Sequence, residues 1–200
     1  MSTAALKRLS WEEYLAKERL AETKSEFYDG EVFAMAGATR KHNLIAGNVY
    51  SELREARKGG PCEAYPSDMC IRCPNGLGAY PDVCVACDPM FEDDREDTLL
   101  NPIVIVEVLS PTTEAWDRGT KFVSYRGLSS LRDYVLVSQN QTLIDHYVRQ
   151  SAFDQWLLTT YHDPHARLRL EALDVTLSIA EIYARLEFPN TGTEPISESD

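Results

Sequence analysis

Apolar residues recur along the chain with two different periods, and these predict a fold that mixes helices and strands. Between Lys41 and about Lys58 the apolar positions follow helical spacing, and Gly59-Gly60-Pro61 ends the pattern. The stretch from Pro102 to Leu109 is instead nearly continuous in apolar, β-branched residues. Such a run is typical of a strand that is covered on both faces.

Local signatures add further elements on either side of these two. Ser10-Trp11-Glu12-Glu13 is a capping box, which predicts a helix from about Trp11 to about Thr23. Asp29-Gly30 lies between apolar residues and predicts a hairpin. Helices are also expected at Glu114 to about Gly127 and at 179–186, and strands at 62–65, 69–73, 80–87, 134–137, 143–148 and 156–161. This order favours an α/β (α+β) sandwich, in which helices flank a mixed sheet.

Length and charge narrow the class of protein. The 200 residues suit one domain, expected at 9–187, with an N-terminal extension at 1–8 and an acidic, disordered tail at 188–200. No apolar run approaches the ~20 residues of a membrane span and no signal peptide is recognisable, so we expect a cytoplasmic protein without a membrane partner. The formal net charge of −12 means that a nucleic-acid partner must be met by a local basic or metal-bearing patch.

The cysteines offer a zinc hypothesis, because Cys70 and Cys73 are spaced like Cys84 and Cys87. If the second pair lies on a strand, however, its side chains point to opposite faces and cannot share a metal. We therefore expect buried cysteines that pack as small apolar residues. Five cysteines without an export signal also fit reduced thiols better than disulfides. A zinc-stabilised binding module remains an alternative.

Two carboxylates carry the main functional hypothesis. On a strand, Asp82 would share a face with Cys84 and Ala86, which are small enough to leave a cavity. Glu107 interrupts an apolar strand, where a carboxylate must be paired, metal-bound or neutralised. If both groups converge, they would bind Mg²⁺ or Mn²⁺, which prefer oxygen ligands. Alternatively, Asp82 caps a turn and Glu107 pairs with an arginine.

A wider set of motifs surrounds these carboxylates. The chain resembles the family called Uma, which is described as one of restriction endonucleases within the PD-(D/E)XK nuclease superfamily. The resemblance extends from about Leu9 to about Tyr183. It rests on Phe27-Tyr28-Asp29-Gly30-Glu31-Val32, Met35-Ala36-Gly37-Ala38, His42-Asn43-Leu44-Ile45, Tyr80-Pro81-Asp82-Val83, Val106-Glu107-Val108-Leu109-Ser110-Pro111-Thr112-Thr113-Glu114 and Asp117-Arg118-Gly119-Thr120-Lys121-Phe122.

The resemblance implies a restriction-endonuclease-like core and an endonuclease that hydrolyses phosphodiester bonds, expected in DNA, with Mg²⁺ or Mn²⁺. Asp82 and Glu107 would hold the metal, and the Val108 carbonyl would be a further ligand. The superfamily pattern places a lysine two residues after the acidic residue, but that position here is Leu109. The family's alternative position, on the following helix, is filled by Lys121, which would assist hydrolysis.

Other residues are candidates for the surroundings of the site. Glu31 and His42 would lie in its outer shell. Arg40, Lys41 and Arg54 would contact nucleic acid, and a homodimer is expected to complete the contact zone. A non-catalytic interaction or regulatory protein that keeps the nuclease scaffold is a second interpretation, since fold does not entail function.

Overall fold

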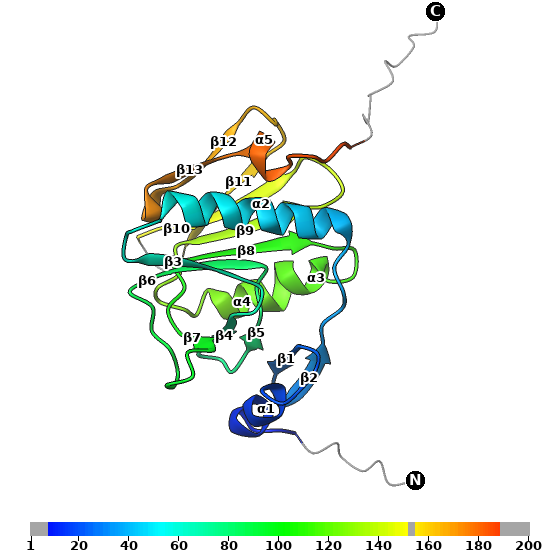
Figure 1. Ribbon diagram of the computed structural model, residues 1–200, viewed down its shortest axis with the longest axis vertical. Helices are drawn as coiled ribbons and strands as arrows, with labels where there is room; N and C mark the ends of the chain where they lie inside the picture. Colours follow the sequence, from blue (N-terminus) through cyan, green and yellow to red (C-terminus); the bar gives the residue numbers. More distant parts are fainter. Residues whose placement is uncertain (1–7, 152–154, 189–200) are drawn as a thin grey trace, which may run out of the picture.

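The computed structural model describes residues 8–151 and 155–188, which fold around a six-stranded mixed sheet (Figure 1). The strand order is β11-β10-β9-β8-β6-β3. Within this sheet β8 and β9 are parallel, and the other neighbouring pairs are antiparallel. The strands are β3 (Cys62–Pro66), β6 (Val83–Cys87), β8 (Val104–Leu109), β9 (Asp133–Ser138), β10 (Ile144–Arg149) and β11 (Trp156–Tyr161).

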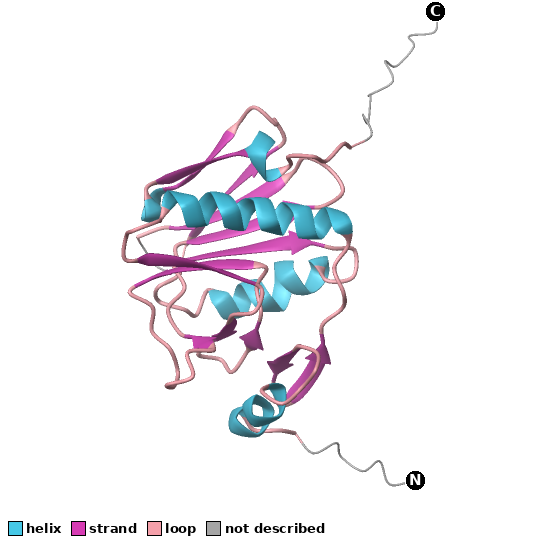
Figure 2. Cartoon of the chain, in the orientation of Figure 1, coloured by secondary structure: helices cyan, strands magenta, loops and turns pink. Residues whose placement is uncertain are grey.

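Helices cover both faces of this sheet (Figures 1 and 2). One face is covered by α2 (Arg40–Ala56), and the other by a continuous helical segment made of α3 (Glu114–Trp116), the π-helical turn η1 (Asp117–Lys121) and α4 (Phe122–Tyr125). The side chains of β8 alternate between the two resulting cores, with its valines on the α2 side and Ile105 and Leu109 on the α4 side. The mixed sheet between helices is the fold predicted from the sequence.

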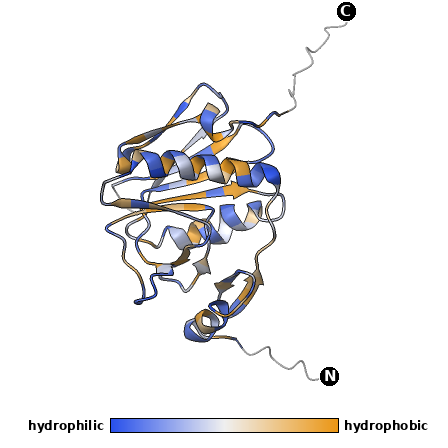
Figure 3. Cartoon of the chain, in the orientation of Figure 1, coloured by the Kyte–Doolittle hydropathy of each residue, from blue (hydrophilic) through white to orange (hydrophobic). Residues whose placement is uncertain are grey.

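The strands between the helices carry much of the hydrophobic colouring in Figure 3, as expected for a sheet buried on two faces. An antiparallel hairpin that the sequence did not predict packs against the same core as α2. It consists of β12 (Arg167–Leu170), the 3₁₀ turn η2 (Glu171–Leu173) and β13 (Val175–Ser178), followed by α5 (Ile179–Ile182). Leu168, Leu170 and Leu177 join the core beneath α2. The closing helix, predicted at 179–186, is shorter than expected, because α5 covers only Ile179–Ile182.

The N-terminal part forms a separate small layer. The capping box is present, but α1 (Trp11–Glu18) ends earlier than predicted, because Glu18 accepts hydrogen bonds from Ser25 where the chain turns into β1 (Ser25–Tyr28). The predicted hairpin joins β1 to β2 (Glu31–Ala34), and both turn residues, Asp29 and Gly30, have positive φ. A five-stranded sheet of order β2-β1-β5-β4-β7 results, with β4 (Cys70–Arg72), β5 (Gly78–Ala79) and β7 (Thr98–Leu99).

The cysteines correct one expectation and confirm another. Cys62 and Cys87 form a disulfide, so the expectation of reduced thiols throughout is wrong for this pair. They are direct partners in the β3–β6 register, which a sequence cannot reveal. The strand argument is confirmed, because Cys84 lies in the α4-side core and Cys87 packs against the α2-side core. Burial raises the pKa of the Cys84 thiol. Cys70, Cys73 and Cys84 are buried and free.

The ends of the chain fall mostly outside the described residues. Of the expected N-terminal extension only Arg8 is described, and of the expected tail only Phe188, whose ring packs edge-on against Tyr183. In the part of the chain that the structure describes, no helix is both long enough and apolar enough to cross a membrane.

Candidate active site

Strand pairing brings the two predicted carboxylates together. In the antiparallel β6–β8 pair, Val83 is the partner of Val106. One residue further along this register, Asp82 stands opposite Glu107, so both side chains lie on the same side of the sheet. Asp82 Oδ2 also accepts a hydrogen bond of 2.7 Å from the Val108 backbone N–H. The three residues that the resemblance assigned to a metal are therefore neighbours.

Lys121 reaches the same place from the helical segment that follows β8. Its Nζ lies 3.1 Å from Glu107 Oε1 and 2.8 Å from Glu26 Oε1. Asp117 Oδ1, one turn back in the π-helical segment, is 3.2 Å away. Lys121 is only 5% exposed, so it is no solvated surface lysine. The site thus pairs one ammonium group with three buried carboxylates.

Several residues of this cluster were not found by sequence reasoning. Glu26 lies on β1, where it accepts a 2.9 Å hydrogen bond from Trp116 Nε1. Tyr125 donates a 3.1 Å hydrogen bond from its hydroxyl to Glu107 Oε1. Asp117 offered a signal, because it precedes Lys121 by four residues and such pairs share one side of a helix. For Glu26, the only signal in the sequence was its position next to the predicted hairpin.

Carboxylates outnumber the single ammonium group in this cluster. Burial raises the pKa of Glu107 well above its ordinary value, and the nearby Asp117, Asp82 and Glu26 carboxylates add to this, whereas Lys121 opposes it. Burial alone would lower the pKa of the Lys121 ammonium, but its carboxylate partners outweigh burial and raise that pKa. Lys121 therefore keeps its proton at neutral pH, and a further cation would be stabilised here.

His42 lies beside the cluster and Glu31 does not. Thr39 caps α2 by accepting a hydrogen bond from the His42 N–H, which fixes His42 in the first turn. From there His42 Nε2 lies 2.7 Å from Asp82 Oδ1. Glu31 is exposed at the start of β2, and none of the contacts recorded for the described residues joins it to Asp82, Glu107 or Lys121.

The donor set can hold a hard divalent cation. Glu107 Oε1 accepts hydrogen bonds from Lys121 and Tyr125, and no described residue donates to Oε2. The described chain contains no group of three His, Cys, Asp or Glu side chains arranged to hold a metal ion. A cation here would thus rely on Asp82, Glu107 and the Val108 carbonyl. Such a set matches Mg²⁺, which commonly uses one or two carboxylates and retains waters.

Two hollows lie along α2. The first, of about 240 Å³, adjoins the carboxylate site and is lined by His42, Asp82, small residues of α2 and the loop after β3. The second, of about 340 Å³, lies at the other end of the helix, where Arg54, Arg57 and Lys58 contribute to its lining. The lining of the first hollow includes Asp82 and no lysine or arginine, whereas cations outnumber carboxylates in the lining of the second. The two hollows are therefore suited to ligands of different charge.

A mixed sheet between helices, with paired carboxylates on neighbouring strands and a lysine on the next helix, defines the restriction-endonuclease-like class of fold. The model of the Uma2 family, described as "Putative restriction endonuclease", matches residues 11–180. The chain belongs to this family.

Two relatives and a solved structure are similar to this chain over most of its length. Two uncharacterised proteins of Synechocystis, slr1290 and sll1609, are 38% and 34% identical to the chain. The alignments cover 93% and 88% of this chain and 97% and 99% of those proteins. A crystal structure from Anabaena variabilis, described as a putative nuclease belonging to DUF820, superposes with a TM-score of 0.73 at 16% identity. That match covers 88% of this chain and 97% of the Anabaena chain, and it supports the fold.

Proposed function

We propose that the protein is a metal-dependent endonuclease that hydrolyses phosphodiester bonds in DNA. The observation that carries the proposal is the meeting of Asp82, Glu107 and Lys121 at one buried site. Membership of a family described as restriction endonucleases supports the same chemistry. Phosphodiester hydrolysis needs an activated water and stabilisation of charge on the phosphate, and this site offers groups for both.

Each residue has a distinct role in this proposal. Asp82, Glu107 and the Val108 carbonyl would hold Mg²⁺ or Mn²⁺. The bound ion would lower the pKa of a coordinated water and neutralise charge on the phosphate. Lys121 would stabilise the developing negative charge, because an ammonium with a raised pKa cannot accept a proton from water. His42 would orient the Asp82 carboxylate through the 2.7 Å contact.

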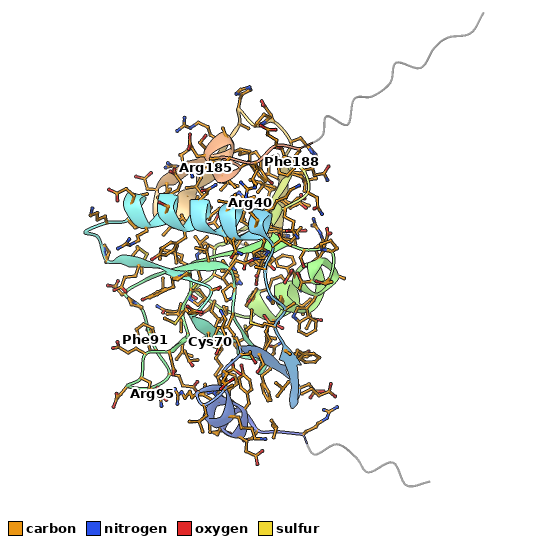
Figure 4. All side chains as sticks on the ribbon, turned by 45° about the vertical axis from the view of Figure 1, so that its right-hand side comes forward. Arg40, Cys70, Phe91, Arg95, Arg185 and Phe188 are labelled. Carbon is orange, nitrogen blue, oxygen red and sulfur yellow. A yellow bond between two sulfur atoms is a disulfide. The ribbon has the colours of Figure 1, made fainter. Side chains whose placement is uncertain are left out.

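The proposed DNA contacts follow α2. Arg40, at the start of this helix, is exposed (Figure 4), and so is Arg54 near its other end. Lys41 lies with its Nζ 5.3 Å from the centre of the Phe188 ring. These cations would provide the local basic surface that a chain of net charge −12 needs. We also propose a homodimer, for which the exposed edge strand β2 offers a pairing surface, and sedimentation velocity tests this.

Plasmid cleavage in Mn²⁺ tests the proposed activity. Wild-type protein should nick supercoiled plasmid, and Asp82→Asn should lower the rate by about 100-fold or more, because it removes a charged metal ligand. Asp94→Asn is the matched control, since Asp94 is exposed in a loop away from the site, and it should cleave like wild type. Equal cleavage by the Asp82 variant would contradict the proposal. Absence of cleavage by the wild type would favour a non-catalytic protein on this scaffold.

A further inference from the structure

The hollow beside Asp82 has the composition of a site for an uncharged ring. Tyr50 and Pro66 contribute apolar rings to its lining, and Asn43 and Ser67 contribute neutral polar groups. Among its lining residues there is no lysine or arginine, whereas Asp82 adds negative charge. A phosphate would be repelled there. The hollow at the far end of α2 differs, because its lining includes two arginines and a lysine beside Glu55 and Glu63.

Size and position narrow the occupant further. The hollow measures about 240 Å³, which is below the ~300–1,000 Å³ of pockets that enclose drug-sized ligands. It can therefore take one ring system. Because His42 and Asp82 form part of its wall, the occupant would lie directly beside the proposed metal site. In a nucleic acid, the aromatic ring nearest to a phosphate is the base of the adjoining nucleotide.

Gly47 gives an independent indication that this space is kept open for a ligand. It lies inside α2, where a glycine destabilises the helix by about 1 kcal/mol relative to alanine. A Cβ at this position would meet no atom within 4 Å, so packing does not require glycine. Its φ is not positive either. Because Gly47 has no side chain, the hollow stays open at this part of its wall.

We propose that this hollow binds the base of an unpaired nucleotide next to the phosphate that is cut, so that the protein acts on single-stranded DNA in preference to duplex. The inference rests on the proposed nuclease function. A base can enter such a pocket only after it leaves the stack, and this is least costly when it is already unpaired. Tyr50 supplies the aromatic surface on which single-stranded nucleic acid commonly stacks.

Gly47→Leu tests the site directly, because it adds a large side chain at a residue that lines the hollow, and leucine is also a better helix former than glycine. Ser51→Leu is the matched control, one turn further along α2, exposed and outside the hollow. Binding is measured by fluorescence anisotropy with labelled oligothymidylate and with a duplex of equal length. Ca²⁺ replaces Mn²⁺, so that affinity is read without cleavage.

The wild type should bind the single strand more tightly than the duplex. Gly47→Leu should weaken single-strand binding by about 5- to 150-fold, as for the loss of one stacked base, and Ser51→Leu should not. The inference is overturned if the two leucine variants bind alike, or if the wild type prefers duplex. The result of the cleavage assay with Asp82→Asn is independent of this binding result. The cleavage assay tests the metal site, whereas the binding assay tests the hollow.

Discussion

Lys121 and its three carboxylate partners set the electrostatics of the site at the scale of single residues. The lysine is nearly fully buried, and its partners Glu26, Glu107 and Asp117 exceed it in charge. A buried group of this kind destabilises the fold unless each charge is compensated. In the proposed nuclease, a bound metal ion would offset this surplus of carboxylates.

Glu107→Gln should therefore stabilise the metal-free protein at high pH. The folded state raises the pKa of Glu107 above its ordinary value of 4.5, chiefly through burial. Ionised Glu107 thus costs folding free energy at pH values above its folded pKa, and the cost disappears as the pH falls toward 4.5. Lys121 keeps two other carboxylate partners in the variant. We expect a gain of roughly 1 kcal/mol or more at pH 8, which shrinks at pH 5.

Urea unfolding at the two pH values, in the presence of a chelator, measures this difference. Glu52→Gln is the control, because Glu52 is exposed on α2 and should change little at either pH. A variant that is less stable than wild type at pH 8 would show that ionised Glu107 is a net stabilising partner of Lys121.

The sequence could identify only part of this residue cluster. Asp82 and Glu107 were recognisable, because a carboxylate within or before an apolar strand needs a partner. Lys121 was recognisable through the family pattern. Glu26 was not, because it comes from β1 in the other sheet, and only tertiary packing places it 2.8 Å from Lys121. The predicted outer-shell residue Glu31, three residues after the end of β1, lies exposed on β2.

At the scale of elements, the π-helical turn η1 orients the site. The sequence predicts one helix from Glu114 to about Gly127, and a continuous helical segment is present, from Glu114 to Tyr125. Its central turn is π-helical over Asp117–Lys121, a geometry often found at functional sites. Both end residues of this turn are buried, and Lys121 contacts both Glu107 and Asp117. Periodicity alone could not reveal the wider turn, because a five-residue π segment does not disturb the apolar pattern enough.

The disulfide is the second element-scale feature, and it fastens the edge strand β3 to β6. Cys62 and Cys87 are separated by 25 residues, so the bond should stabilise the fold by about 3 kcal/mol through the entropy of the unfolded chain. We expect a reducing agent to lower the melting temperature of the wild type. The Cys62→Ala/Cys87→Ala variant should melt near the temperature of the reduced wild type and be insensitive to reductant. A wild type that reductant leaves unchanged would contradict the bond.

At the scale of the whole molecule, the site forms where the two sheets meet. Asp82 and Glu107 come from the six-stranded sheet, Glu26 from the five-stranded sheet, His42 from α2 and Lys121 from η1. The mixed sheet and the helices that flank it followed from the hydrophobic pattern, whereas the strand order is known only from the structure. The hairpin of β12 and β13 did not follow from this pattern, because its strands are only four residues long. The pairing of β1 with β5 and of β4 with β7 did not either, because these partners are distant in sequence.

The most direct test of the metal site is anomalous diffraction from a crystal soaked in Mn²⁺. We predict one strong anomalous peak within coordination distance of both the Asp82 and Glu107 carboxylates, with the Val108 carbonyl as a further ligand and Lys121 close by. An absent peak, or one confined to the exposed acidic loop around Asp93 and Asp94, would contradict the assignment of Asp82 and Glu107 as the metal ligands of a nuclease.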